Sequence, residues 1–382
     1  MRRVVIDSRE VEPGDIFIPI KGEHHDGHAF IDEVIRKGGQ VLDVDIAQYA
    51  KQYRKKLKCP IIGVTGSAGK TTVKDLLASV LGQKYTVVKT LENQNNEIGV
   101  PLTVLRADYS TEILIVELAM RHPGEIGQLA RIVRPTHTVI TSVGMTHVEI
   151  LKTPRKIALA KAEIFTAPLS AETAPRYAFL NHSSGFYDLL HRKATAKGYT
   201  IFPFGGQDKP DQNINLCTTI GHHFGLTDVQ IAAGFAQFES SSHRLKVSHL
   251  SGSAGAITLV DDTYNANPDG VAYSLQYLRR FNGRKILVLG DMLELGEYSE
   301  AAHQGVVDQA LDAGVDVIFT YGPASANMKS EDVSIVSFLD KAQLHQVVLD
   351  ELKAGDVVLV KGSRGMKMEE TVEYVSDRYV HV

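Results

Sequence analysis

Short apolar segments alternate with longer amphipathic segments along most of this chain. In its middle, Pro60 to Thr65, Glu112 to Leu118 and Thr138 to Val143 are apolar runs of the length of buried strands. Apolar residues recur at helical spacing in Thr71 to Leu81 and Gly124 to Ile132. This alternation predicts a parallel, doubly wound α/β sheet.

The same alternation returns near the carboxyl end of the chain. Buried-type strands are predicted at Ile257 to Asp261, Lys285 to Leu289, Val315 to Thr320 and Asp356 to Val360. Helical segments separate these strands, so we expect a second α/β unit of Rossmann-like size.

The beginning of the chain is built from shorter elements. Asp15 to Ile20 and Gln40 to Val44 indicate strands, and Phe30 to Lys37 indicates an amphipathic helix between them. We therefore predict an α/β protein with a small N-terminal domain, a central P-loop ATPase-like domain and a C-terminal Rossmann-like domain. The expected ranges are 1–57, 58–242 and 243–382.

Composition and charge exclude several classes of protein. The net charge of -4 leaves no basic footprint for nucleic acid, and no apolar run approaches the roughly 18–20 residues that span a bilayer. No apolar core follows the basic residues at the amino end, as a signal peptide requires. Cys59 and Cys217 lack metal-binding spacing. We expect a cytoplasmic protein with no membrane insertion and no nucleic acid partner.

A glycine-rich segment joins the first central strand to its helix. Its residues are Gly66, Ser67, Ala68, Gly69, Lys70, Thr71 and Thr72. Such a loop cradles phosphates with backbone N–H groups, and Lys70 would reach the β- and γ-phosphates of ATP while Thr71 would ligate Mg²⁺. Val64 stands where the strict pattern has glycine, so the match is a variant. The alternative is a glycine-rich turn with an exposed lysine.

Two polar residues follow central strands. Glu117 ends one strand and His147 lies just beyond another, at the edge where sites form in parallel sheets. Glu117 could ligate Mg²⁺, or could only cap or pair. His147 could be a ligand, or a solvated loop histidine.

Lys161 stands at an unusual position in its helix. Ile157 precedes it by four residues, and Ile164 and Phe165 follow by three and four, so Lys161 lies on the apolar stripe. A lysine there either extends its ammonium to solvent or works with a shifted pKa or a modification.

These features, in this order, resemble the Mur ligase superfamily, and most closely its branch that adds D-alanyl-D-alanine to a UDP-linked muramoyl tripeptide. The segments that carry the resemblance are the phosphate loop, Glu92 to Pro101, Glu117 to Ile126, Asp261 to Pro268, Leu289 to Gly296 and Lys361 to Glu369. The resemblance implies that Thr71, Glu117, His147 and Lys161 hold two Mg²⁺ ions, with Lys161 carrying a CO₂-derived carbamate.

The resemblance also implies roles on the nucleotide side. Arg244 would reach the phosphates of ATP from the start of the third domain, and Asn265 would contact adenine and ribose. Lys70, Lys161, His147 and Arg244 would then form the catalytic set. An exposed hinge arginine is the alternative for Arg244.

Further residues are implied for the two other substrates. Ser8, Arg9 and Lys21 lie in segments that look like the UDP-sugar-recognising domain, and Asn95 and Asn96 would contact the muramoyl peptide. The third domain would receive the incoming dipeptide with three residues, Lys361, Ser363 and Arg364. An ordinary turn is the alternative for the last group, and loop packing for the two asparagines.

The chain departs from the family pattern in three ways. Its first domain is short. Its central domain is clipped, because a hairpin that usually precedes the signature at Asn213 is missing after Phe204 and Gln212 occupies the histidine position of that signature. Arg121 stands where asparagine is usual. The implied protein is thus a shortened family member.

The expected reaction is ATP-dependent amide ligation through an acyl phosphate, in peptidoglycan precursor synthesis. The expected enzyme is a monomer whose third domain closes about residues near Ser240 to Arg244. Two alternatives remain. One is a related ligase with another amino-acid or peptide acceptor, and the other is a nucleotide-binding scaffold that has lost ligation.

Overall fold

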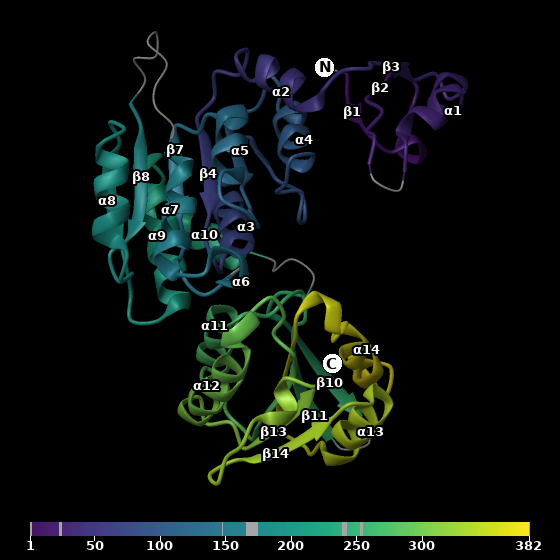
Figure 1. Ribbon diagram of the computed structural model, residues 1–382, viewed down its shortest axis with the longest axis vertical. Helices are drawn as coiled ribbons and strands as arrows, with labels where there is room; N and C mark the ends of the chain where they lie inside the picture. The colour runs from purple at the N-terminus through teal and green to yellow at the C-terminus, as the bar shows by residue number, and fades with distance from the viewer. Residues whose placement is uncertain are drawn as a thin grey trace.

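The computed structural model describes residues 2–22, 25–146, 148–165, 175–238, 243–252 and 255–381. Three sheets follow one another along the chain, with three, six and seven strands. Figure 1 shows them in three separate parts of the molecule, with the N-terminal sheet at one side of the central part. The predicted α/β class with three units is confirmed.

The N-terminal sheet is parallel, in the order β1-β2-β3. Its strands are Val4–Val5, Ile16–Phe17 and Gln40–Val41, and helix α1 spans Ile31–Arg36. A small core of Val5, Val11, Phe17 and Val34 holds this unit together. Both predicted strands are therefore present but shorter than the apolar runs.

The central sheet is wholly parallel, in the order β5-β6-β4-β7-β8-β9. From β4 to β9 its strands are Ile61–Thr65, Val87–Lys89, Ile113–Glu117, His137–Ile140, Tyr177–Asn181 and Thr200–Phe204. Buried residues fill β4, β6 and β7 throughout, because helices cover both faces.

The central helices divide between the two faces. From α2 to α10 they are Ile46–Arg54, Lys70–Leu81, Gly99–Arg106, Glu125–Val133, Val148–Leu151, Pro154–Lys161, Tyr187–Thr195, Lys209–His223 and Asp228–Ala236. Helices α3, α9 and α10 share one apolar cluster with the sheet, and α2, α4, α5, α7 and α8 share the other. Helix α2 is thus part of the central layer, and the Tyr53 hydroxyl donates a 2.7 Å hydrogen bond to the carbonyl of Ala107.

The C-terminal sheet is mixed, in the order β14-β13-β12-β15-β11-β10-β16. From β10 to β16 its strands are Lys246–Gly252, Gly255–Asp262, Lys285–Gly290, Val317–Tyr321, Ser334–Phe338, Val357–Lys361 and Tyr379–His381. Five strands are parallel, while β10 runs antiparallel to β11 and to β16. Helices α11 to α14 span Pro268–Leu278, Ser299–Asp312, Lys341–Glu351 and Glu369–Ser376.

Short 3₁₀ helices complete the structure at Ser8–Glu10, Gly27–Phe30, Ala162–Ile164, Gly296–Tyr298, Ser325–Asn327 and Arg364–Met366.

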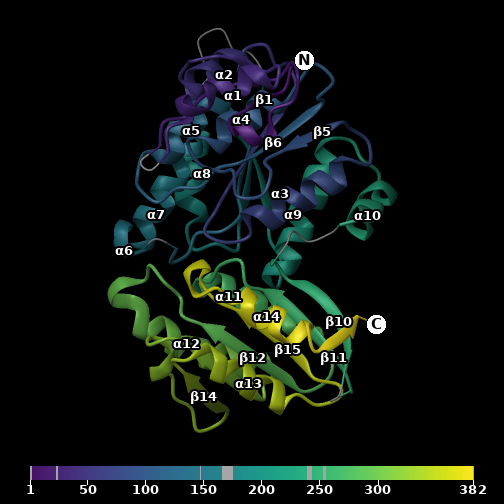
Figure 2. The ribbon, with the colours of Figure 1, turned by 90° about the vertical axis from the view of Figure 1, so that its right-hand side faces the viewer.

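The carboxyl ends of the central strands face the C-terminal unit, and Figures 1 and 2 both place helix α11 between them. The Nδ2 of Asn213 donates to the Tyr273 hydroxyl at 3.4 Å, and Arg280 lies 3.3 Å from the carboxylate of Asp211. These contacts join the central unit to the C-terminal unit, and the candidate site lies between the two.

Candidate active site

A cleft of about 1360 Å³ lies between the central and C-terminal units. It gathers most of the residues that the sequence singles out. These are Ser67, Ala68, Gly69, Lys70, Thr71, Thr72, Asn95, Asn96, Glu117, Arg244, Asn265, Lys361, Ser363 and Arg364. Segments from Ser67 to Arg364 therefore meet at one place, as the sequence predicts for the carboxyl edge of a parallel sheet.

The phosphate loop lines the cleft on the side of the central unit. Gly69 precedes helix α3 with φ of 80°, a left-handed conformation that glycine adopts without strain. The amides at the start of α3 have no carbonyl four residues earlier in the helix, so they are free to meet an anion. The Lys70 ammonium bends back and donates to the Gly66 carbonyl at 2.9 Å. Burial lowers the pKa of Lys70, and the charge of Glu117 partly offsets this.

Glu117 lies at the end of β6 and is fully enclosed, with 1% of its surface exposed. The Thr71 hydroxyl donates to one carboxylate oxygen at 2.9 Å, and Asn95 Nδ2 donates to the other at 2.8 Å. A carboxylate and a hydroxyl beside a phosphate loop are the hard oxygen ligands that Mg²⁺ takes. The two residue types at this point fit a magnesium ion.

Lys161 ends helix α7 and is 2% exposed, so the prediction that it lies on the buried side is confirmed. Ile157, Ile164 and Phe165 are buried in the same apolar cluster. Burial lowers the pKa of Lys161 well below its usual value, the charge of Lys70 lowers it further, and Asp269 partly offsets both. Lys161 therefore lies behind the cleft wall and near Lys70, where burial disfavours the charged form of its amine.

His147 lies outside the described residues. The loop that leads to it contacts the phosphate loop, because the Thr146 hydroxyl donates to the Ser67 carbonyl at 3.2 Å. Within the described ranges, no three histidine, cysteine, aspartate or glutamate side chains gather as a metal-binding group.

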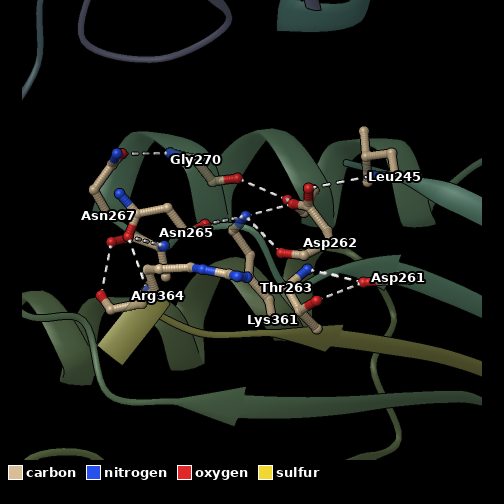
Figure 3. Close-up of polar contacts among 12 residues, drawn as sticks. Leu245, Asp261, Asp262, Thr263, Asn265, Asn267, Gly270, Lys361 and Arg364 are labelled. Atoms are coloured by element: carbon tan, nitrogen blue, oxygen red, sulfur yellow. Dashed lines mark hydrogen bonds and ion pairs between the residues drawn. The ribbon is translucent and has the colours of Figure 1, made fainter. Parts of the chain in front are cut away.

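The opposite wall belongs to the C-terminal unit. The guanidinium of Arg244 stacks over the Tyr264 ring at 3.8 Å from its centre. Asn265 Oδ1 accepts from the Ala266 amide at 2.9 Å and from the Arg364 amide at 3.4 Å. Figure 3 shows Asn265 and Arg364 beside each other at the end of the sheet.

Lys361 and Ser363 line this wall, yet both are buried. The Lys361 ammonium donates to the carboxylate of Asp262 and, at 3.0 Å, to the Asn265 carbonyl (Figure 3). The Ser363 hydroxyl donates to the Ala266 carbonyl at 3.1 Å and accepts from the Leu293 amide at 2.9 Å. Of the three residues expected near the dipeptide, only Arg364 is exposed.

Three candidate residues lie away from the cleft, in the N-terminal unit. Ser8 is buried, and its carbonyl accepts from Lys37 at 2.9 Å. The Arg9 guanidinium pairs with Asp7 at 2.6 Å, and Lys21 is exposed. The structure does not bring Ser8, Arg9 or Lys21 to the nucleotide side.

Comparisons with known proteins follow the same division of the chain. The models for the Mur ligase family catalytic domain, the Mur ligase middle domain and the Mur ligase glutamate ligase domain match residues 1–92, 64–230 and 243–364. The UDP-N-acetylmuramoyl-tripeptide–D-alanyl-D-alanine ligase of Bacillus subtilis (strain 168) is 32% identical, over 97% of this chain and 92% of that protein. The chain belongs to the Mur ligase family.

Other Mur ligases agree over the same length. The ligase of that name from Escherichia coli (strain K12) is 28% identical over 98% of this chain and 93% of its own length. The crystal structure of MurF ligase from Thermotoga maritima in complex with ADP matches with a TM-score of 0.82 and 28% identity, over 99% of this chain and 97% of that chain. Similarity therefore covers all three units.

Several cleft residues of this Mur ligase escaped the sequence reasoning. Asn93, Arg121, Leu293 and Glu294 line the cleft, and Asp262 lies at its edge inside a network of hydrogen bonds. All five stand in segments that carry the family resemblance, so the signal was the motif rather than any single residue.

Among the described residues, no helix has both the length and the apolar content needed to cross a bilayer.

Proposed function

We propose that this chain joins D-alanyl-D-alanine to UDP-N-acetylmuramoyl-tripeptide with the cleavage of ATP to ADP and phosphate, in peptidoglycan precursor synthesis. The observation that carries the proposal is one cleft with Lys70 and Glu117 on one wall and Arg244 on the other. The printed names of the relatives supply the two substrates. An anion cradle opposite an arginine is the arrangement that phosphoryl transfer requires.

In the first step, a carboxylate oxygen of the tripeptide attacks the γ-phosphorus of ATP. The bond to the β,γ-bridging oxygen breaks, ADP leaves, and an acyl phosphate forms. The amides at the start of α3 and the side chains of Lys70 and Arg244 hold the phosphates in line and balance their negative charge. Asn265, at the C-terminal wall, would meet the adenosine part.

Glu117 and Thr71 would hold Mg²⁺, whose positive charge offsets that of the triphosphate. Their oxygens already lie 2.9 Å apart, close enough for both to meet one ion. Asn95 orients the carboxylate of Glu117 from the other side. His147 is proposed as a further ligand.

Lys161 is proposed to carry a carbamate. Its uncharged amine would attack CO₂, form a nitrogen–carbon bond and release one proton, so that a buried base becomes an acid. The low pKa that burial imposes on Lys161 supports this, because only the unprotonated amine is nucleophilic. The carbamate oxygens would then add to the ligands of a second Mg²⁺.

In the second step, the amine of the dipeptide attacks the acyl carbon, and phosphate leaves as the amide bond forms. Ser363 and Arg364 are proposed on this side, and Asn96 beside the muramoyl peptide. Ser8, Arg9 and Lys21 of the N-terminal unit would recognise the UDP-sugar. Closure of the C-terminal unit over the cleft would exclude water from the acyl phosphate.

A cytoplasmic monomer is proposed as the working form. Both cysteines are free, and Cys217 is buried, which suits a reducing compartment. The cleft is formed by elements of one chain, so the site does not need a second copy to supply its walls.

The test is phosphate release by the purified chain with ATP, Mg²⁺ and the UDP-linked tripeptide. We expect release to depend on D-alanyl-D-alanine, and mass spectrometry to find the UDP-linked pentapeptide. Other dipeptides and single amino acids serve as competing acceptors. A Lys70→Ala variant is the control, because it keeps the loop but removes the phosphate contact. ATP binding without acceptor-dependent release would overturn the proposal.

A further inference from the structure

A buried ion pair stands at the carboxyl ends of two neighbouring parallel strands. Asp262 ends β11 and Lys361 ends β15, and the two are direct partners in the register of the sheet. Asp262 is 8% exposed and Lys361 is 3% exposed. Figure 3 shows the lysine side chain extending to the aspartate.

All three protons of the Lys361 ammonium have acceptors within the C-terminal unit. They are directed at the Asp262 carboxylate, at the Asp262 carbonyl at 3.4 Å and at the Asn265 carbonyl at 3.0 Å. An ammonium has three donors and no acceptor. Lys361 thus has no donor left for the carboxylate of an incoming dipeptide in this arrangement.

The second carboxylate oxygen of Asp262 reaches the segment that enters the C-terminal unit. Asp262 Oδ1 accepts a 3.2 Å hydrogen bond from the backbone amide of Leu245, next to Arg244 (Figure 3). The Ser274 hydroxyl donates to the oxygen that Lys361 also binds. Asp262 therefore connects the end of the sheet to the backbone that carries Arg244.

The backbone on either side of Arg244 has an unfavourable conformation. His243 has φ of 62° and Leu245 has φ of 51°, both in the left-handed region that side chains with a Cβ rarely adopt. Such a conformation persists only where surrounding contacts hold it. Here the Tyr264 amide donates to the His243 carbonyl at 3.0 Å, and Asp262 holds the amide of Leu245.

We propose that Lys361 and Asp262 are positioning residues, which hold Arg244 toward the phosphate end of the cleft through the backbone of Leu245. This rests on the proposed function, which gives Arg244 its place at the transferring phosphate. Lys361 fixes the carboxylate of Asp262, Asp262 fixes the Leu245 amide, and the adjacent guanidinium is left stacked on Tyr264. Lys361 acts on the ATP step and not on the acceptor.

The test isolates the hydrogen bond to Leu245 in a background without the buried charges. Lys361→Met is combined with either Asp262→Asn or Asp262→Leu, which have nearly the same shape. Both double variants lack the ion pair, so neither leaves a lone buried charge. Only the asparagine keeps an oxygen that can accept from the Leu245 amide. Lys329→Met, at an exposed lysine of the same unit, is the control.

Two readouts follow each variant. One is acyl phosphate formation from ATP and the tripeptide without dipeptide, trapped by borohydride reduction. The other is the ATP affinity from calorimetry, which needs no ligation. We expect the Leu form to lose roughly 10- to 100-fold in the first step relative to the Asn form, with weaker ATP binding and an unchanged KM for dipeptide. Far-UV circular dichroism would show both forms folded alike.

Repetition in an Arg244→Ala background tests whether the effect passes through Arg244. We expect the difference between the Asn and Leu forms to disappear there. A difference that persists, equal first-step rates in the two forms, or a change confined to the dipeptide KM would overturn the positioning role. If the native chain formed no acyl phosphate at all, the proposed function would fail, and the calorimetric comparison would still decide whether Asp262 acts on nucleotide binding.

Discussion

The Thr71 hydroxyl donates a 2.9 Å hydrogen bond to the carboxylate of Glu117, joining the first turn of α3 to the end of β6. The two residues are separated by forty-six positions in the chain. Their contact arises because β4 and β6 are neighbours in a parallel sheet, whose carboxyl ends meet at one edge.

Glu117→Gln should reduce the rate of phosphate release on the order of 100-fold while leaving the fold intact. The amide keeps the shape of the side chain and an oxygen for Thr71, but it removes the charge that a magnesium ion would meet. The measurement is phosphate release at increasing Mg²⁺ concentration. Glu112→Gln, at the exposed start of the same strand run, is the control. An unchanged Mg²⁺ dependence in Glu117→Gln would contradict the metal role.

Lys161→Met should abolish bicarbonate-dependent activity, with a loss on the order of 100-fold or more. The methionine fits the same apolar surroundings but has no amine to accept CO₂. The assay compares phosphate release in CO₂-depleted buffer with and without added bicarbonate, and ¹³C-labelled bicarbonate allows the carbamate to be observed by NMR. Lys156→Met, on the exposed side of the same helix, should behave like the native chain.

His137 should make the central unit less stable in mild acid. Burial, with a smaller effect of His223, lowers the pKa of His137 to about 3, while the unfolded chain keeps the usual 6.5. As pH falls below 6.5 the unfolded state takes up a proton that the folded state refuses, so stability decreases until about pH 3. Between pH 7 and pH 5 this amounts to about 2 kcal/mol.

Calorimetry at the two pH values measures this effect, since the chain has no tryptophan to report unfolding. His137→Gln should show a smaller drop between pH 7 and pH 5, with part remaining because burial also lowers the pKa of His223. His249→Gln, in an exposed strand position, is the matched control. Equal drops in all three proteins would rule out His137 as the cause.

Gly144→Ala should disturb the contact between the central and C-terminal units. A Cβ at this position would lie 1.4 Å from a carboxylate oxygen of Asp269, and that oxygen accepts from the Met145 amide at 3.1 Å. The Asp269 side chain must then move and give up its bond to Met145, which loosens the contact between the two units. We expect activity to fall at least about 10-fold because a small displacement of reacting groups is costly. Small-angle scattering and phosphate release measure both effects.

The clash in Gly144→Ala depends on Asp269, which offers a second variant. Adding Asp269→Ala removes the oxygens that the new methyl group would meet. The double variant should recover the compact scattering profile of the native chain. If Gly144→Ala alone keeps that profile and full activity, the contact between Gly144 and Asp269 does not control the arrangement of the units.

The sequence predicted best where a clear strand or helix pattern was followed by glycine. The strand expected at Pro60 to Thr65 and the helix expected at Thr71 to Leu81 lie within one residue of β4 and α3. Edge and near-edge strands were missed instead. Strand β9 contains Pro203 and is half exposed, and β10 has few apolar residues. Neither strand therefore shows the apolar pattern of a buried strand.

The candidate site shows the same division. Helical spacing alone placed Lys161 on the buried side, because its apolar neighbours are three and four residues away. The partner of Lys361 could not be read in this way. Asp262 is ninety-nine residues distant, and the two meet only through the pairing of β11 with β15. His147 lies outside the described residues, so its expected place at the metal stays a prediction.

The ion pair between Asp262 and Lys361 also favours the correct register of β15 against β11. A slip of β15 by one residue against β11 would turn every side chain of the strand to the opposite face. An ammonium and a carboxylate would then be sealed apart in an apolar interior, an error of several kcal/mol. A sheet with the wrong register is therefore much less stable than the native sheet, and the nucleotide site forms only on the native one.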